Sequence, residues 1–129
     1  IKKFKIKNLN NNFSNVKYSK INNKICTYYT KLIFNHPDFI YIDGPSPLSV
    51  KGYKLNMPMS GDVLNYEHFL NPGTIILIDG RTANARFLKS NFQRNWIYRH
   101  DKLNDQSIFY LKESPLGKKN KILLNFYKS

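Results

Sequence analysis

Two short apolar runs dominate the pattern of hydrophobic and polar positions along this chain, and each of them stops at Asp-Gly. The first run extends from Asp38 to Gly44, and the second extends from Gly73 to Gly80. Both runs are rich in isoleucine and are bounded by residues that favour turns. Continuous apolar runs of this length are typical of strands that are buried on both faces of a sheet.

The segments around these two runs alternate between helical and strand-like patterns. Apolar residues recur at helical spacing in three of them, and Ser60 is a suitable N-cap for the second. The expected helices cover residues 25–34, 61–69 and 82–93; the expected strands cover residues 16–21, 38–43, 73–79, 95–100 and 107–112, with a turn at 22–24. This order predicts an α/β fold: a mostly parallel sheet with helices on both faces and an antiparallel C-terminal strand pair.

Asp43 and Asp79 terminate the two apolar runs, which makes them candidate site residues. In an open α/β sheet, ligands bind outside the carboxyl ends of parallel strands. We therefore expect the two carboxyl groups to lie within roughly 10 Å of each other, given a strand spacing of about 4.8 Å, and near any ligand. The alternative is that each aspartate only caps the loop or helix that follows it.

The charge balance suggests an anionic partner but does not single out nucleic acid. The chain has 21 Lys and Arg residues against 8 Asp and Glu residues, which gives a net charge of +13. Only four of the basic residues are Arg, and the charge is spread along the chain except at the N-terminus, where no acid precedes Asp38. Lys, Asn, Ile, Phe and Tyr are enriched together, as AT-rich coding produces, so we do not expect nucleic-acid binding.

The single cysteine, Cys26, excludes an internal disulfide and a cysteine-based zinc site, and we expect it to be a buried thiol. No apolar run reaches the roughly 18 residues of a membrane span, and no signal-peptide pattern occurs. We therefore expect a cytoplasmic protein of one domain, or part of one, whose oligomeric state is open. It would consist of a basic N-terminal segment (1–15), a core (16–112) and a Lys-rich tail (115–129).

The order of elements and several local motifs resemble the C-terminal half of a class I S-adenosylmethionine-dependent methyltransferase. In that family the fourth strand ends in a motif like Phe39–Gly44, and a Leu-Asn-Pro-Gly turn, here at 70–73, leads into a fifth strand like Thr74–Asp79. The last two strands of the family form an antiparallel pair, as residues 95–112 could. The resemblance covers about residues 16–112 and implies a Rossmann-like sheet.

Two cofactor-binding features of that family have no counterpart in this chain. No Gly-x-Gly occurs anywhere, and no acid precedes Asp38 that could hold the ribose of the cofactor. The resemblance therefore implies either the C-terminal part of a longer methyltransferase or a shortened relative that has lost cofactor binding. It also implies that this chain alone binds S-adenosylmethionine weakly or not at all, with Gly44 as its candidate cofactor contact.

The resemblance also implies roles for the residues at the strand ends. Asp43 would orient or deprotonate the methyl acceptor, and Asp79 would assist it or share a divalent cation. A metal-dependent subgroup of the family holds a cation with carboxylates at these two places, but it usually has a second acid or amide where this chain has Gly80. Arg81 and Asn84, at the start of the next expected helix, would contact the acceptor, or else would form a salt bridge and a cap.

Two functional hypotheses follow. The first is a methyltransferase-like domain that transfers a methyl group from S-adenosylmethionine to an oxygen or nitrogen of a small-molecule acceptor. The second is a non-catalytic Rossmann-like interaction domain that binds an anionic partner through its basic N-terminal face. A strand followed by a Gly-x-Gly turn upstream of residue 1 would favour the first hypothesis.

Overall fold

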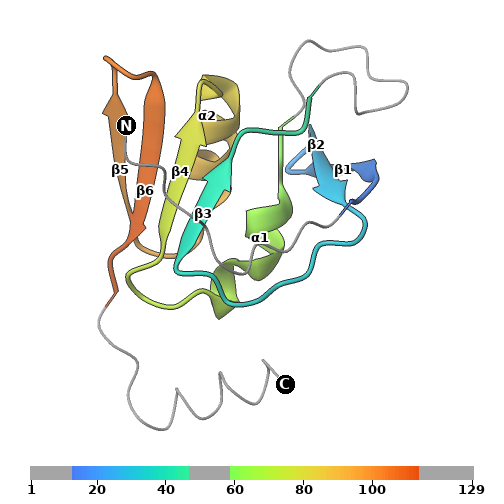
Figure 1. Ribbon diagram of the computed structural model, residues 1–129, viewed down its shortest axis with the longest axis horizontal. Helices are drawn as coiled ribbons and strands as arrows, with labels where there is room; N and C mark the ends of the chain where they lie inside the picture. Colours follow the sequence, from blue (N-terminus) through green and yellow to red (C-terminus); the bar gives the residue numbers. More distant parts are fainter. Residues whose placement is uncertain (1–12, 47–58, 114–129) are drawn as a thin grey trace, which may run out of the picture.

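A computed structural model describes residues 13–46 and 59–113 of the chain (Figure 1). The strands are β1 (Val16–Ile21), β2 (Lys24–Tyr29), β3 (Phe39–Ile42), β4 (Ile75–Asp79), β5 (Trp96–Asp101) and β6 (Gln106–Leu111). The helices are α1 (Asp62–Tyr66), the 3-10 turn η2 (Glu67–Phe69) and α2 (Thr82–Asn91). Most of the basic N-terminal segment and the Lys-rich tail lie outside the described residues.

Four strands form the main sheet, in the order β3-β4-β6-β5. β3 and β4 are parallel, whereas β6 runs antiparallel to both of its neighbours. The prediction of a mostly parallel sheet is therefore wrong, because one of these three strand pairs is parallel. The C-terminal pair was predicted to be antiparallel, and the four-residue connection between β5 and β6 can join only antiparallel strands. The prediction failed because β6 also pairs antiparallel with β4, and because β1 lies outside this sheet, in a hairpin with β2. The returning strand β6 then lies between β5 and β4.

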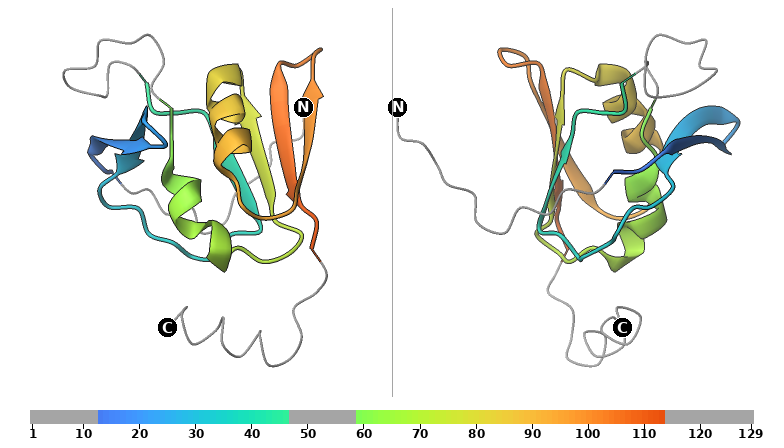
Figure 2. Two further views of the ribbon diagram at one scale, coloured as in Figure 1. Left: turned by 180° about the vertical axis from the view of Figure 1, so that it is seen from behind. Right: turned by 45° about the vertical axis from the view of Figure 1, so that its right-hand side comes forward.

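Both helices of the described part lie on the same face of the main sheet (Figure 2). The prediction of a Rossmann-like α/β fold with helices on both faces is therefore wrong. Of the described residues, 38% lie in strands and 20% in helices. Side chains alternate across each strand, so Ile76 and Ile78 are buried toward the helices while Phe39, Tyr41 and Ile75 are exposed on the other face. The two apolar runs were predicted to be buried on both faces because the positions that face away from the helices are apolar too. No helix in the described residues is long and apolar enough to cross a membrane.

β1 and β2 form a separate antiparallel hairpin. Asn22 and Asn23 join them with positive φ angles of 48° and 63°, which a two-residue turn of the I′ type requires and asparagine tolerates. The predicted turn is therefore confirmed, but the helix predicted after it is wrong, because this segment forms β2. Thr27 and its aromatic neighbours favour a strand, and Thr27 also pairs with Ser60 just before α1.

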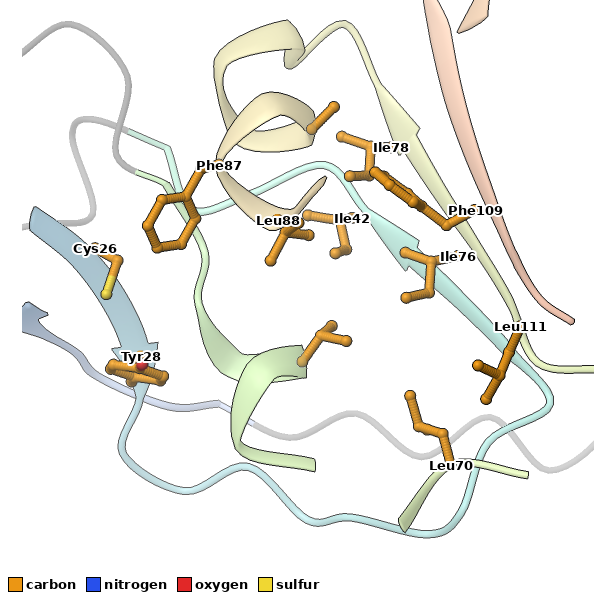
Figure 3. Packing of buried hydrophobic residues seen from close by; sticks show 12 residues of the cluster. Cys26, Tyr28, Ile42, Leu70, Ile76, Ile78, Phe87, Leu88, Phe109 and Leu111 are labelled. Atoms are coloured by element: carbon orange, nitrogen blue, oxygen red, sulfur yellow. The ribbon is translucent and has the colours of Figure 1, made fainter. Parts of the chain in front are cut away.

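The hydrophobic core fills the space between the sheet, the helices and β2 (Figure 3). Phe87 and Leu88 of α2 lie between the sheet residue Ile76 on one side and Cys26 and Tyr28 of β2 on the other. Cys26 is fully buried, as predicted, and this burial raises the pKa of its thiol. The core thus joins the small hairpin to the main sheet.

A buried carboxylate, that of Glu67, fastens η2 to the start of β5. It accepts hydrogen bonds from the backbone N–H groups of Gln93 and Arg94 and from the indole nitrogen of Trp96, at 2.8 to 2.9 Å. The guanidinium of Arg94 donates to the Glu67 carbonyl and pairs with Glu113 at 2.7 Å. A buried carboxylate is tolerated only when it is hydrogen-bonded in this way, so the network holds the helical side of the sheet in place.

Candidate functional site

The two Asp-Gly strand ends lie next to each other at one edge of the main sheet. β3 and β4 are adjacent and parallel, and Ile42 is level with Ile78, so Asp43 and Asp79 follow at the same height. Adjacent strands are separated by about 4.8 Å. The register therefore agrees with the prediction that the two strand ends lie side by side.

Tyr41 links these two ends on the open face of the sheet. Its hydroxyl donates a hydrogen bond to Oδ2 of Asp79 at 2.7 Å. This bond, followed by desolvation and by the charges of Asp79 and Asp43, raises the pKa of Tyr41 to about 12. The side-chain amide of Gln106 donates to the other oxygen of Asp79 at 3.3 Å. Both oxygens of Asp79 are therefore engaged by neighbouring strands.

A cavity of about 290 Å³ opens beside β3, which is an edge strand of the described sheet. Its walls come from the end of β2, the segment that leads into β3, β3 itself and α1. Most of the lining is aliphatic or aromatic and includes Leu32, Ile33, Phe34, Val63, Tyr66 and Leu70. Apolar walls with a few polar groups are the usual character of a small-molecule site.

Two carboxylates belong to this lining, and they differ in exposure. Asp43 is exposed, whereas Asp62 in the first turn of α1 is buried. Asp62 accepts hydrogen bonds from the backbone N–H of Tyr29 and from the Ser60 hydroxyl, both at 2.9 Å, and so joins β2 to α1. Burial raises the pKa of Asp62, although these hydrogen bonds oppose the shift. Gly61, and not Ser60 as predicted, is the N-cap residue of α1.

Arg81 and Asn84, the predicted substrate contacts, lie behind this site and do not line the cavity. Arg81 is buried, and its Nη1 donates to the carbonyl of Pro45 at 3.3 Å, which connects the loops after β3 and β4. Asn84 is fully buried and holds the backbone of Ser60: its Oδ1 accepts from the Ser60 N–H at 2.7 Å, and its Nδ2 donates to the Ser60 carbonyl at 3.0 Å. Both side chains therefore position the segments around the cavity.

Gly44, the predicted cofactor contact, lies at the edge of the cavity directly after Asp43. A Cβ at Gly44 would come within 3.0 Å of the Tyr29 hydroxyl. The close approach of Tyr29 accounts for a glycine at this position without a bound cofactor. The described residues also contain no group of three or more His, Cys, Asp or Glu side chains that could hold a metal ion.

Asp43 is the residue of this region that can bind a polar group of a ligand, because it is an accessible carboxylate at an apolar cavity. Such a group accepts a hydrogen bond from the O–H or N–H of a ligand whose apolar part fills the cavity. Sequence reasoning missed Tyr41 and Asp62 as members of this region. Tyr41 could have been found from the two-residue period of β3, which places it on the same face as Asp43. No sequence pattern around Asp62 indicates that it belongs to the cavity lining.

Comparisons of the chain with protein-family models, with curated proteins and with solved structures found no match. The chemistry of the cavity and of the two strand ends is therefore the basis for assigning a function.

Proposed function

We propose that the cavity beside β3 is the acceptor site of a methyltransferase-like domain, in which a small molecule presents an oxygen or nitrogen to Asp43. The observation that carries the proposal is the position of Asp43, an exposed carboxylate in the lining of an apolar cavity at the end of a parallel strand pair. Methyl transfer suits such a site because it depends mainly on positioning the acceptor, since the sulfonium of the donor already carries a good leaving group.

Asp43 would hold the acceptor through its O–H or N–H group and receive the proton that the acceptor loses. An ionised carboxylate is a hydrogen-bond acceptor only, so it selects for a donor group on the ligand. A positioned base typically contributes of order 10²–10⁴ in rate. Asp79 has a supporting part, because its oxygens are engaged by Tyr41 and Gln106.

The proposal does not include a site for the methyl donor. S-adenosylmethionine would supply the methyl group, but the chain contains no Gly-x-Gly, and the space beside Gly44 is taken up by Tyr29. We therefore limit the proposal to the acceptor side, and weak or absent binding of S-adenosylmethionine to this chain stays a prediction. A divalent cation was considered only as an alternative role for Asp79 and is not part of the proposal.

A non-catalytic interaction domain is the second hypothesis. Its basic N-terminal face falls mainly on residues 1–12, which lie outside the described residues. An apolar cavity with a carboxylate in its lining has no part in binding an anionic partner through that segment. The described part of the chain therefore supports the acceptor site better.

Methyl transfer is tested with S-adenosylmethionine that carries a deuterated methyl group, at millimolar concentration because weak cofactor binding is expected. Phenols, catechols, arylamines and benzylamine serve as acceptors, and mass spectrometry detects the product. We expect labelled product and a rate that falls by about 10²–10⁴ in Asp43→Asn. Asp38→Asn is the matched control, because it makes the same change at the other end of β3, and its rate should be unchanged. The proposal fails if no acceptor is labelled or if both variants retain the full rate.

A further inference from the structure

The cavity beside β3 is acidic in a protein that is strongly basic. Lys and Arg outnumber Asp and Glu by 21 to 8 in the whole chain. Among the described residues that line the cavity, Asp43 and Asp62 are the charged ones, and no Lys or Arg is present. With this excess of basic residues, a cavity formed without regard to charge would be expected to contact a lysine. The described part of the lining therefore disfavours binding of an anion.

Arg81 is the basic residue whose charge reaches the cavity wall. Burial and the charge of Asp62 raise the pKa of the Tyr29 phenol, whereas the charge of Arg81 opposes the shift. Arg81 does not line the cavity, and its guanidinium donates a hydrogen bond to the carbonyl of Pro45. Burial is the largest cause of this shift, and of the two charges that of Asp62 has the larger effect on Tyr29.

The shape of the cavity requires an apolar body on the ligand. Phe34 and Tyr66 stack with their ring centroids 4.5 Å apart and an interplanar angle of 7°, and both rings belong to the lining. Leu32 and Ile33 are 43% and 62% exposed, so an occupant would remove apolar surface from water. A volume of about 290 Å³ is at the small end of ligand sites, which fits one ring with a short chain.

We infer that this cavity takes a small organic amine, bound as its ammonium cation, in preference to a carboxylate or a phosphate. The ammonium group donates hydrogen bonds to Asp43 at the exposed part of the lining, and Asp62 adds negative charge from the buried part. The inference rests on the proposed function for the identity of the site and names the class of its acceptor. Before methyl transfer the ammonium group must give one proton to Asp43, because only the neutral amine has the lone pair that forms the new N–C bond while the S–C bond of the donor breaks. An anionic ligand would be repelled by both carboxylates.

Three probes of nearly equal shape separate charge from shape: benzylamine, benzyl alcohol and benzoate. Titration calorimetry at neutral pH and low salt measures their affinities for the full chain. We expect benzylamine to bind about tenfold more tightly than benzyl alcohol, because its ammonium group forms one partly screened ion pair with Asp43. We expect benzoate to bind most weakly. Asp43→Asn should remove most of the preference for benzylamine, because only the charge of Asp62 remains, while the affinity for benzyl alcohol is unchanged. Asp38→Asn should keep the preference.

The inference is overturned if the three probes bind equally, if benzoate binds most tightly, if benzylamine does not bind, or if Asp43→Asn keeps the preference for benzylamine. Circular dichroism confirms that both variants are folded, which is expected because both aspartates are exposed. Failure of the proposed function gives a different result: benzylamine binds with the expected preference, but no acceptor receives the labelled methyl group.

Discussion

The two strand ends have the same local sequence, Ile-Asp-Gly, and different surroundings. β3 is an edge strand of the described sheet, and the cavity opens beside it, so Asp43 remains accessible. β4 lies between β3 and β6, and these two neighbours supply Tyr41 and Gln106, which engage both oxygens of Asp79. The difference teaches that the place of a strand in the sheet, and not the residues at its end, decides which carboxylate is available to a ligand.

The two glycines that follow these aspartates differ in what constrains each position to glycine. Gly80 has a φ of +59°, a backbone conformation that residues other than glycine rarely adopt. Gly44 is not in that region, and its constraint is the Tyr29 hydroxyl, which would lie 3.0 Å from an added Cβ. One glycine is required by the backbone and the other by a side chain from β2.

The largest expected effect comes from exchanging each carboxylate for its amide. Asp43→Asn should lower the rate of methyl transfer by about 10²–10⁴, because the amide cannot receive the proton of the acceptor. Asp79→Asn should lower the rate much less, because this side chain does not line the cavity and has only a supporting part. Steady-state rates with the labelled donor measure both. Equal losses in the two variants would remove the distinction between the strand ends.

A second test compares the two glycines by urea unfolding. Gly80→Ala should lower the free energy of unfolding by about 1–2 kcal/mol, because alanine is strained at a positive φ. Gly44→Ala should cost less, because the Tyr29 hydroxyl is the end of a side chain and can shift by a few tenths of an ångström.

The double variant Gly44→Ala with Tyr29→Phe is the control for the second test. Removing the hydroxyl should restore part of the stability lost in Gly44→Ala, whereas Tyr29→Phe should not rescue Gly80→Ala. Rescue of both, or of neither, would mean that the Tyr29 contact is not what constrains Gly44.

The smallest expected effect is a change in the titration of Tyr41. Its pKa of about 12 should fall toward the ordinary value of about 10 in Asp79→Asn, because the hydrogen bond to the carboxylate is its main cause. Asp43→Asn should lower the pKa less, because Asp43 contributes only through its charge. Nuclear magnetic resonance of labelled tyrosine rings, with Tyr41→Phe to assign the signal, measures both values. A pKa near 10 in the unmodified protein would contradict the bond to Asp79.

The raised pKa of Tyr41 also predicts the direction of a stability change. Because the pKa in the folded protein lies above the ordinary value of about 10, the protonated phenol favours folding. This contribution is fully present below pH about 10 and is lost as the pH rises through about 12. The loss should be absent in Tyr41→Phe.

Local patterns in the sequence predicted much of the secondary structure correctly. The strands β3 and β4, the turn at Asn22-Asn23 and the hairpin of β5 and β6 follow from apolar runs and from residues that favour turns. The helix expected after that turn was wrong, because a rough apolar period cannot separate a short helix from a strand whose buried face meets another element. β2 is decided by its bridge to Ser60 and by its burial against α1.

The sequence by itself determined where the strands end and that each end carries an aspartate, because these features depend on neighbouring residues. Only the tertiary structure decided that β6 lies between β4 and β5, that both described helices cover one face of the sheet, and that β3 is an edge strand beside a cavity. These outcomes depend on which distant segments bury their apolar sides together. The local sequence is compatible with several such arrangements, and burial of the shared core selects one of them.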